Sequence, residues 1–286
     1  MEKVFEIINK RDSVRTYSPL AIEEEKREVL SQFFDSNTKG PFGNSVRFKL
    51  VDIKKETQGE LKKYVSYGNI KGAHTFIVGA VKKGSMAMED FGYCMQKNVL
   101  MATSLGLGTV WLGGSINRSS FADSLKKTED ELIPAITPLG YGADKRSMMD
   151  KVISTVSGGK NRLAFEKLFF SKDLSSALTK ENCKNYKDPL EAVRLAPSAS
   201  NKQPWRIVKD KKKDVFHFYM NEHPSMKKEP SNPQFKGIHI QHNDMGIAMC
   251  HFELTATELG LNGRWEILHD HAPLGDLVYV VSWIAS

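Results

Sequence analysis

The sequence predicts an α/β unit of helices and strands that occurs twice in one chain. When the chain is compared with itself at an offset of 154 residues, segments 90–111 and 244–265 share ten identical residues without a gap. Both halves also show the same order of patterns: a helix, a loop with Pro and Asn, a strand, a long helix, Leu-Gly-Leu and a strand. Two such units amount to a fused dimer, so we expect an intramolecular pseudo-dimer with a ligand pocket between its halves.

The composition is that of a globular protein with a basic surface. Of the 286 residues, 40% are hydrophobic and 26% are charged, which allows a sizeable core. The net charge of +7 and the pI near 9.1 favour anionic partners. The densest basic run, 209–214, lies between two strand-like segments and is typical of a hairpin turn. Since the aromatic residues lie in apolar runs rather than among Lys and Arg, we expect no nucleic-acid partner.

Cysteine usage and hydropathy bear on the compartment. Cys94, Cys183 and Cys250 are far apart and form no Cys-x-x-Cys pair, so we expect neither a disulfide framework nor a structural zinc site. This usage fits the reducing cytoplasm, and the N-terminus carries no signal-peptide pattern. Segment 98–116 is apolar but interrupted by Thr, Ser and Gly, which indicates a buried helix and strand and no membrane partner.

The first half opens with a helix and an alternating polar segment. Apolar residues at 4, 5, 7 and 8 recur with helical spacing. Arg11, Ser13 and Arg15 follow at every second position, so an extended backbone would place all three side chains on one face. Two guanidinium groups and a hydroxyl on one face form a phosphate clamp, because each Arg can bind phosphate oxygens bidentately. A solvated basic edge is the alternative.

The rest of the first half alternates helices and strands. We expect a helix over 22–34 with acidic residues in its first turn, a Pro-containing loop over 41–44 and a strand over 48–53. The continuous apolar run 75–81 predicts a central strand. Segment 90–108 predicts a long helix that Gly106 ends and whose small residues on one face allow another helix to approach closely.

The most informative stretch is the loop over 196–206, which follows a predicted helix over 189–195 and precedes strand residues 207–208. Two prolines restrict its backbone, and its hydroxyl and amide groups can converge on one polar, planar or anionic ligand. These groups belong to Ser198, Ser200, Asn201 and Gln203. A turn whose Ser and Asn only cap the local backbone is the alternative.

The two halves have lost complementary parts. The first half (1–150) has the clamp but a degraded loop over 41–44, whereas the second half (188–286) has the rich loop and no clamp. We therefore predict one site that pairs the clamp with the second loop across the interface. A crossover segment over 151–187 would join the halves, with a short helix over 163–170 packed on the partner half.

Several motifs together resemble the nitroreductase family of FMN enzymes. They are Arg-x-Ser-x-Arg at 11–15, the helix end Ser-Leu-Gly-Leu-Gly at 104–108, Leu-Gly-Tyr-Gly at 139–142, and Ala-Pro-Ser-x-x-Asn-x-Gln-Pro-Trp at 196–205. More narrowly, the chain resembles the fused-monomer branch, in which one chain supplies both halves of what is ordinarily a homodimer. The resemblance implies an α+β fold (an α/β sandwich) with mainly antiparallel sheets and with long helices at the interface of the pseudo-dimer.

The resemblance also implies a site for FMN. Arg11, Ser13 and Arg15 would hold the phosphate, the ribityl chain and the pyrimidine edge of the flavin. Asp12, between the two arginines, departs from the family pattern in a way that could weaken phosphate binding. The flavin would lie along Trp111, Leu112, Gly113 and Gly114 of the first half and would be wrapped by Pro197, Ser198, Ala199, Ser200 and Asn201 of the second.

Further residues have a looser place in the implied site. Asn69 or Lys71 would reach the pyrimidine ring, and Lys145 and Arg146 would complete the phosphate site unless they form an ordinary solvated turn. Trp111 aligns with Trp265 in the repeat, and both indole rings are expected in the core rather than stacked on the flavin.

The resemblance implies a cytoplasmic, NAD(P)H-dependent FMN oxidoreductase that is a monomer with an internal pseudo-dimer. NAD(P)H would reduce the flavin at N5 and leave, and a small electron-poor acceptor such as a nitroaromatic or a quinone would then take the hydride in a ping-pong mechanism. No catalytic side chain is assigned, and no metal is expected because His239 and His242 are typical of a surface pair. The alternative is a flavin-binding protein without turnover that serves storage or sensing.

Overall fold

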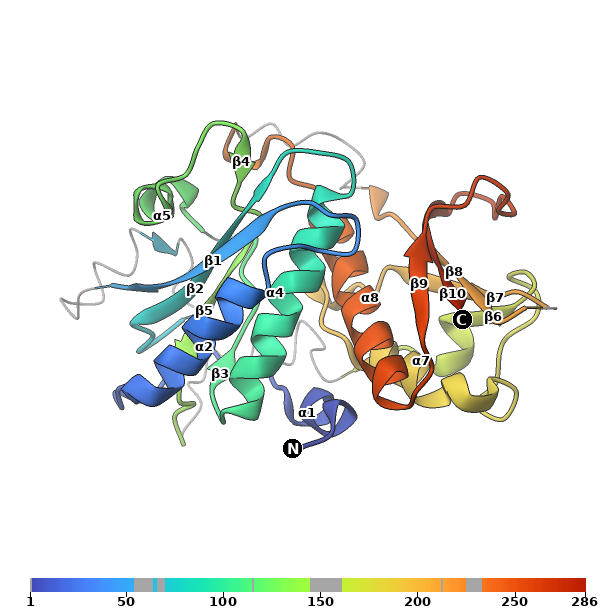
Figure 1. Cartoon of the computed structure of the whole chain (residues 1–286), viewed down its shortest axis with the longest axis horizontal. Coiled ribbons are helices and arrows are strands. Elements are labelled where there is room, and N and C mark those ends of the chain that lie inside the picture. Colours follow the sequence, from blue (N-terminus) through green and yellow to red (C-terminus); the bar gives the residue numbers. More distant parts are fainter. Residues whose placement is uncertain are drawn as a thin grey trace.

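The computed structural model describes residues 2–53, 64–65, 70–114, 116–144, 161–211, 213–224 and 233–286. Two long helices lie side by side at the centre, with one β-sheet in each half of the molecule (Figure 1). Helices combined with mainly antiparallel sheets make this an α+β protein, as the sequence predicted. Three residues of the predicted site, Asn69, Lys145 and Arg146, lie outside the described ranges.

The first sheet has β2 (Thr75–Lys82) in its interior, as the apolar run predicted, and only the last residue of this strand is exposed. β2 pairs with β1 (Val46–Asp52) on one side and with β5 (Ile136–Gly140) on the other. On its other edge β5 pairs with β3 (Gly108–Thr109), and β4 (Glu131–Leu132) pairs with the end of β2. All of these pairings are antiparallel.

The second sheet has the strand order β6-β7-β8-β10-β9. β7 and β8 form the hairpin that was predicted around residues 209–214. Only β6 and β7 run parallel among the pairs of this sheet. The strands are β6 (Phe169–Ser171), β7 (Trp205–Lys209), β8 (Val215–Met220), β9 (Gly263–Glu266) and β10 (Val278–Ala285).

Segment 163–170 is not the short helix that we expected. Only η1 (Phe165–Lys167) is helical, as a single 3-10 turn, and β6 begins at Phe169. The reason is a tertiary contact: the amide of Ile207 in β7 donates to the carbonyl of Leu168 at 2.9 Å, and Leu168 and Phe169 are fully buried. The edge of β7 thus satisfies backbone groups that a helix would have satisfied internally. The domain boundaries at residues 150 and 187 remain predictions.

The central helices α4 (Ala87–Ser104) and α8 (Ile240–Glu258) touch through glycine. A Cβ atom on Gly92 would overlap the backbone carbonyl of Asn243, and one on Gly246 would overlap that of Glu89. The two contacts are related by the same offset of 154 residues that relates the sequence repeat. The small residues predicted to allow close helix approach therefore do so, and the contact has the reciprocal form of a two-fold interface.

Shorter helices surround this pair. α1 (Val4–Lys10) contacts α4, α8 and α7 (Lys187–Leu195), so the N-terminal helix rests against the second half. α2 (Glu24–Ser36) packs on β1 and α5 (Arg118–Leu125) packs on β2, while η2 (Lys184–Tyr186) leads into α7. Among the described residues, no helix combines the length and the apolar composition that a bilayer span requires. The placement of α1 brings the segment after it to the loop before β7.

Candidate functional site

A cavity of about 520 Å³ lies between the two halves, and it gathers most of the predicted cofactor residues. Arg11, Ser13, Arg15 and segment 110–114 of the first half line one part, and segment 197–201 and the first turns of α8 line the other. Asp12 is not among the lining residues. The predicted residues that do line the cavity are Arg11, Ser13, Arg15, Trp111, Leu112, Gly113, Gly114, Pro197, Ser198, Ala199, Ser200 and Asn201.

The clamp segment is extended, as its alternation predicted. α1 ends at Lys10, and the amide of Val14 then donates to the carbonyl of Thr109 at 2.9 Å, which ties the segment to β3. The carbonyl of Arg15 accepts from the amide of Lys71 at 2.9 Å on the other side. Because the backbone is held on both sides in this extended form, the side chains at 11, 13 and 15 reach the same cavity.

The loop before β7 has an unusual backbone that its own side chains maintain. Ser200, Asn201 and Gln203 have φ angles of 50°, 53° and 48°, in the left-handed region that non-glycine residues rarely adopt. The hydroxyl of Ser198 accepts from the amide of Gln203 at 2.9 Å, and the side-chain oxygen of Gln203 accepts from the amide of Leu163 at 2.8 Å. Gln203 therefore holds the loop, and it is not among the described residues that line the cavity.

A buried aspartate anchors this loop, and its repeat equivalent anchors the other one. The carboxylate of Asp244 accepts from the amide of Ala199 at 3.0 Å, and burial raises the pKa of Asp244 well above its usual range. In the first half, Asp90 accepts from the amides of Phe42 and Asn44 at 2.9 Å each. The offset of 154 residues relates Asp90 to Asp244, so the two Pro-containing loops occupy equivalent places in their halves.

The cavity wall holds the guanidinium groups of Arg11, Arg15 and Arg162. The pKa of Arg11 is lowered to about 10, mainly by burial and further by the positive charge of Arg162, while Asp12 opposes the shift. In the described part of the chain, the buried Nε of Arg11 has no hydrogen-bond partner. Arg162 donates to the side-chain oxygen of Asn201 at 2.9 Å and to the carbonyl of Leu195 at 3.1 Å. Two adjacent guanidinium groups of this kind favour an anion between them.

Asn243 is a second polar group without a partner in the cavity wall. Its side chain is 2% exposed, and neither its amide nitrogen nor its amide oxygen is hydrogen-bonded within the described residues. A buried amide left in this way is destabilising unless a ligand completes it. Asn243 and Arg162 were both missed by the sequence analysis. The only local signal for Asn243 is that it precedes the repeated Asp244.

A buried chain of hydrogen bonds holds the indole of Trp111. Its Nε1 donates to the side-chain oxygen of Gln96 at 2.9 Å, and Gln96 Nε2 lies 2.8 Å from Nε2 of His251. His251 Nδ1 lies 2.8 Å from the carbonyl of Ala192, which can only accept. His251 is therefore neutral with its proton on Nδ1, and its Nε2 accepts from Gln96. This series of hydrogen bonds connects α4, α8 and α7 to the cavity wall.

The histidines near the start of α8 have protein partners. His242 is partly exposed and lies beside His239, and it also hydrogen-bonds the buried carboxylate of Glu89 through Nδ1. Asp244, two residues on, is engaged with Ala199. Within the ranges that the structure describes, no three His, Cys, Asp or Glu side chains form a group that could hold a metal ion.

Comparison with known proteins fits this geometry. A family model described as "Putative TM nitroreductase" matches residues 3–256 of the chain. The chain belongs to this nitroreductase family. Nitroreductases are oxidoreductases, which places the chain in that class of enzymes. A search of curated proteins by sequence gave no match.

Solved structures give the fold of this nitroreductase. A "putative nitroreductase" from Thermotoga maritima is 18% identical, with a TM-score of 0.61 over 99% of this chain and 94% of that chain. An FMN-dependent nitroreductase from Clostridium difficile is 22% identical, with a TM-score of 0.39 over 49% of this chain and 88% of its own. A nitroreductase with bound FMN from Desulfitobacterium hafniense is 18% identical, with a TM-score of 0.41 over 51% and 92%. Only the first of these likenesses is close enough to support the fold.

Proposed function

We propose that the cavity between the halves binds FMN and that the protein is an NAD(P)H-dependent reductase of small electron-poor acceptors such as nitroaromatics or quinones. The observation that carries the proposal is the convergence of the clamp, segment 111–114 with its two glycines, and the Pro-containing loop over 197–201 on one cavity of about 520 Å³. FMN, when bound, accepts and returns a hydride at N5. The protein residues bind the flavin, orient it and adjust its electrostatic surroundings.

The positive groups of the cavity suit the anionic part of FMN. Arg11 and Arg162 would hold the phosphate, since burial lowers the pKa of both guanidinium groups and the positive charge of Arg162 lowers that of Arg11 further, so that an anion would stabilise both. Ser13 would bind the ribityl chain. Arg15 would face the pyrimidine edge, where a fixed positive charge favours the reduced, anionic flavin. The Nε of Arg11, which lacks a partner in the described residues, supports this fit.

The remaining walls suit the flat ring system. A Cβ atom on Gly114 would meet nothing within 4 Å, so a planar ligand can approach the backbone there. Trp111 is held in place by Gln96, and apolar side chains of α8 such as Ile240 and Ile247 face the same space. Asn243 would complete its hydrogen bonds on the polar atoms of the ligand. A planar, electron-poor acceptor would lie beside the flavin ring, because the open space at Gly114 also admits a second flat molecule.

The test is a flavin titration followed by reduction. The purified protein is saturated with FMN, unbound flavin is removed, and NADPH or NADH is added without oxygen. We expect retained flavin whose visible absorption bleaches and returns when a quinone or a nitroaromatic is added. Retained flavin that neither nucleotide bleaches would instead identify a storage or sensing protein. A protein that retains no flavin at saturating FMN would contradict the proposed site.

A further inference from the structure

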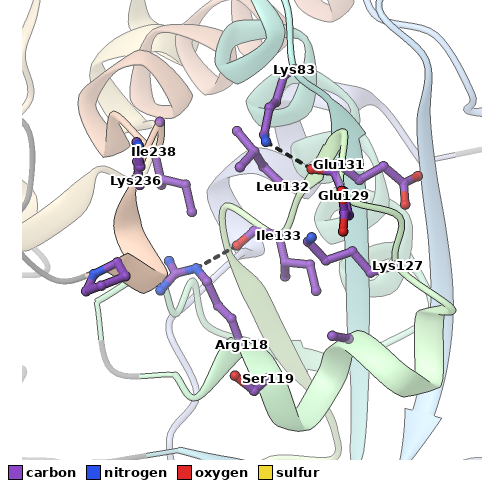
Figure 2. A pocket seen from close by; sticks show the side chains of 13 residues that line it. Lys83, Arg118, Ser119, Lys127, Glu129, Glu131, Leu132, Ile133, Lys236 and Ile238 are labelled. Atoms are coloured by element: carbon purple, nitrogen blue, oxygen red, sulfur yellow. Dashed lines mark hydrogen bonds between the residues drawn. The ribbon is translucent and has the colours of Figure 1, made fainter.

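A second cavity, of about 570 Å³, adjoins segment 111–114 of the proposed flavin site, because Arg118 in its wall donates to the carbonyl of Gly113. Figure 2 shows the side chains that line this cavity. Its walls come from Lys83 directly after β2, from α5 and the turn after it, from β4, and from η5 (Pro233–Phe235) and the segment that leads from it into α8. Both halves of the chain therefore contribute to it. Of the predicted cofactor residues that the structure describes, none lines this cavity.

Four cationic side chains from four segments converge on this cavity. They are Lys83, Arg118, Lys127 and Lys236. The ammonium group of Lys83 donates to the carbonyl of Glu129 at 2.9 Å, and that of Lys127 donates to the carbonyl of Thr128 at 2.9 Å. Backbone carbonyls thus fix these two groups without cancelling their charge. In the described part of the chain, none of the three lysines forms an ion pair.

Arg118 is the buried member of this set. Its side chain is 7% exposed, and it donates to the carbonyls of Ile133 at 2.8 Å, Pro134 at 2.9 Å and Gly113 at 2.7 Å. Its guanidinium carbon also lies 4.2 Å from the ring centre of Phe235. These partners are neutral, and burial lowers the pKa of Arg118 to about 10. A fixed, desolvated cation is therefore built into the wall that separates this cavity from the flavin site.

The two carboxylates in the lining do not cancel this charge. Glu131 is bound by Arg47, Nε to Oε1 and Nη2 to Oε2 at 2.7 Å each, and the pKa of Glu131 is accordingly lowered to about 2. Among the described residues that line the cavity, Glu129 is then the one remaining carboxylate against four cations. Leu132, Ile133 and Ile238 add an apolar surface beside the charged groups. Cations fixed around an apolar surface suit an organic molecule that carries a phosphate.

We propose that this cavity is a second binding site, for a phosphate-bearing small molecule, distinct from the flavin site. The second cavity is a direct neighbour of the flavin site, because Arg118 in its wall donates a hydrogen bond to the carbonyl of Gly113, which lines the flavin site. The phosphate has two possible sources. It belongs either to the adenosine 2′-phosphate end of NADPH or to a separate phosphorylated molecule. Lys83 and Lys127 carry the recognition in both cases.

The test uses adenosine 2′,5′-bisphosphate as the probe, titrated by calorimetry into the full chain with FMN present. We expect K83M and K127M each to weaken binding about three- to tenfold, and the double variant about 30-fold or more. The matched controls are the sequence neighbours K82M and K126M. Lys82 is 64% exposed and faces Asp130, Lys126 is exposed, and neither lines the cavity. The control variants should bind as the wild type does.

The proposal is overturned if the folded wild type does not bind the probe, or if the controls lose as much affinity as K83M and K127M. It is also overturned if R11A and R15A abolish binding while K83M and K127M do not, because the probe then occupies the flavin clamp. The two sources are separated by kinetics. A KM for NADPH that rises in K83M while the KM for NADH does not identifies the dinucleotide. Unchanged KM values together with weakened probe binding identify a separate phosphorylated molecule.

Discussion

Lowering the pH from 7 to 5 should destabilise this protein through one buried side chain, His251. The pKa of His251 is lowered to about 3, mainly by burial and further by the charges of Arg11 and Arg162, whereas an exposed histidine titrates near 6.5. Protonation would also place a hydrogen on the Nε2 atom that accepts from Gln96. The folded state therefore excludes a proton that the unfolded chain readily binds.

The sign and size of the effect follow from this difference. A histidine whose pKa is lower in the folded than in the unfolded protein makes its full contribution to the free energy of unfolding above the unfolded pKa. This contribution is lost progressively as the pH falls from about 6.5 toward 3. Each pH unit within this window is worth about 1.4 kcal/mol, so the interval from pH 7 to pH 5 removes about 2 kcal/mol. Because His251 is fully buried, solvent screening does not reduce this value appreciably.

The assay is urea denaturation of the wild type and of H251Q at pH 7, 6 and 5. H251Q will be less stable at pH 7, but its free energy of unfolding should fall less on acidification, by about 2 kcal/mol at pH 5. Taking the difference between the two proteins cancels the titration of all other groups. Parallel pH profiles for the two proteins would refute the assignment of a neutral, buried His251.

Three substitutions test the interface and the flavin site. G246A should lower the free energy of unfolding by about 2–3 kcal/mol in the same urea titration, because its Cβ atom would overlap the carbonyl of Glu89. The control G142A should stay close to the wild type, because its Cβ atom would lie 3.5 Å from Val14. D244A should weaken FMN binding about tenfold in a flavin titration, while D90A, which loosens the equivalent loop of the first half, should not. R162A should weaken FMN binding tenfold or more, and an unchanged affinity would remove Arg162 from the phosphate site.

Local spacing predicted the parts of the site that depend on local geometry. The alternation of Arg11, Ser13 and Arg15 was enough to predict that the three side chains reach one cavity, because an extended backbone fixes which side chains share a face. The repeat was enough to predict the close contact between α4 and α8, because Gly92 and Gly246 lie at equivalent positions of the two halves. Both predictions use only neighbours in sequence or an internal copy.

The parts that were missed depend on contacts distant in sequence. Arg162 reaches Asn201 and Leu195 from the crossover segment, and no local pattern marks it. β6 forms because β7 offers it an edge, which composition does not reveal. Gln203 lies within a motif that suggests a ligand contact, but its amide oxygen accepts from Leu163. In each case the deciding partner is about 40 residues away along the chain.

The repeat also explains why we expect one flavin per chain rather than two. At the positions equivalent to Asn243 and Ile247 of the cavity, the first half has Glu89 and Tyr93. Glu89 is 3% exposed and bound to His242, and Tyr93 is 8% exposed. The carboxylate of Glu89 is already engaged by His242, whereas the amide of Asn243 has no partner among the described residues and remains available to a ligand, and Tyr93 is bulkier than Ile247. The absorbance of bound flavin against protein concentration should therefore give a ratio of one. A ratio of two would show that the opposite pairing of clamp and loop also forms a site, and that the differences between the halves do not select between them.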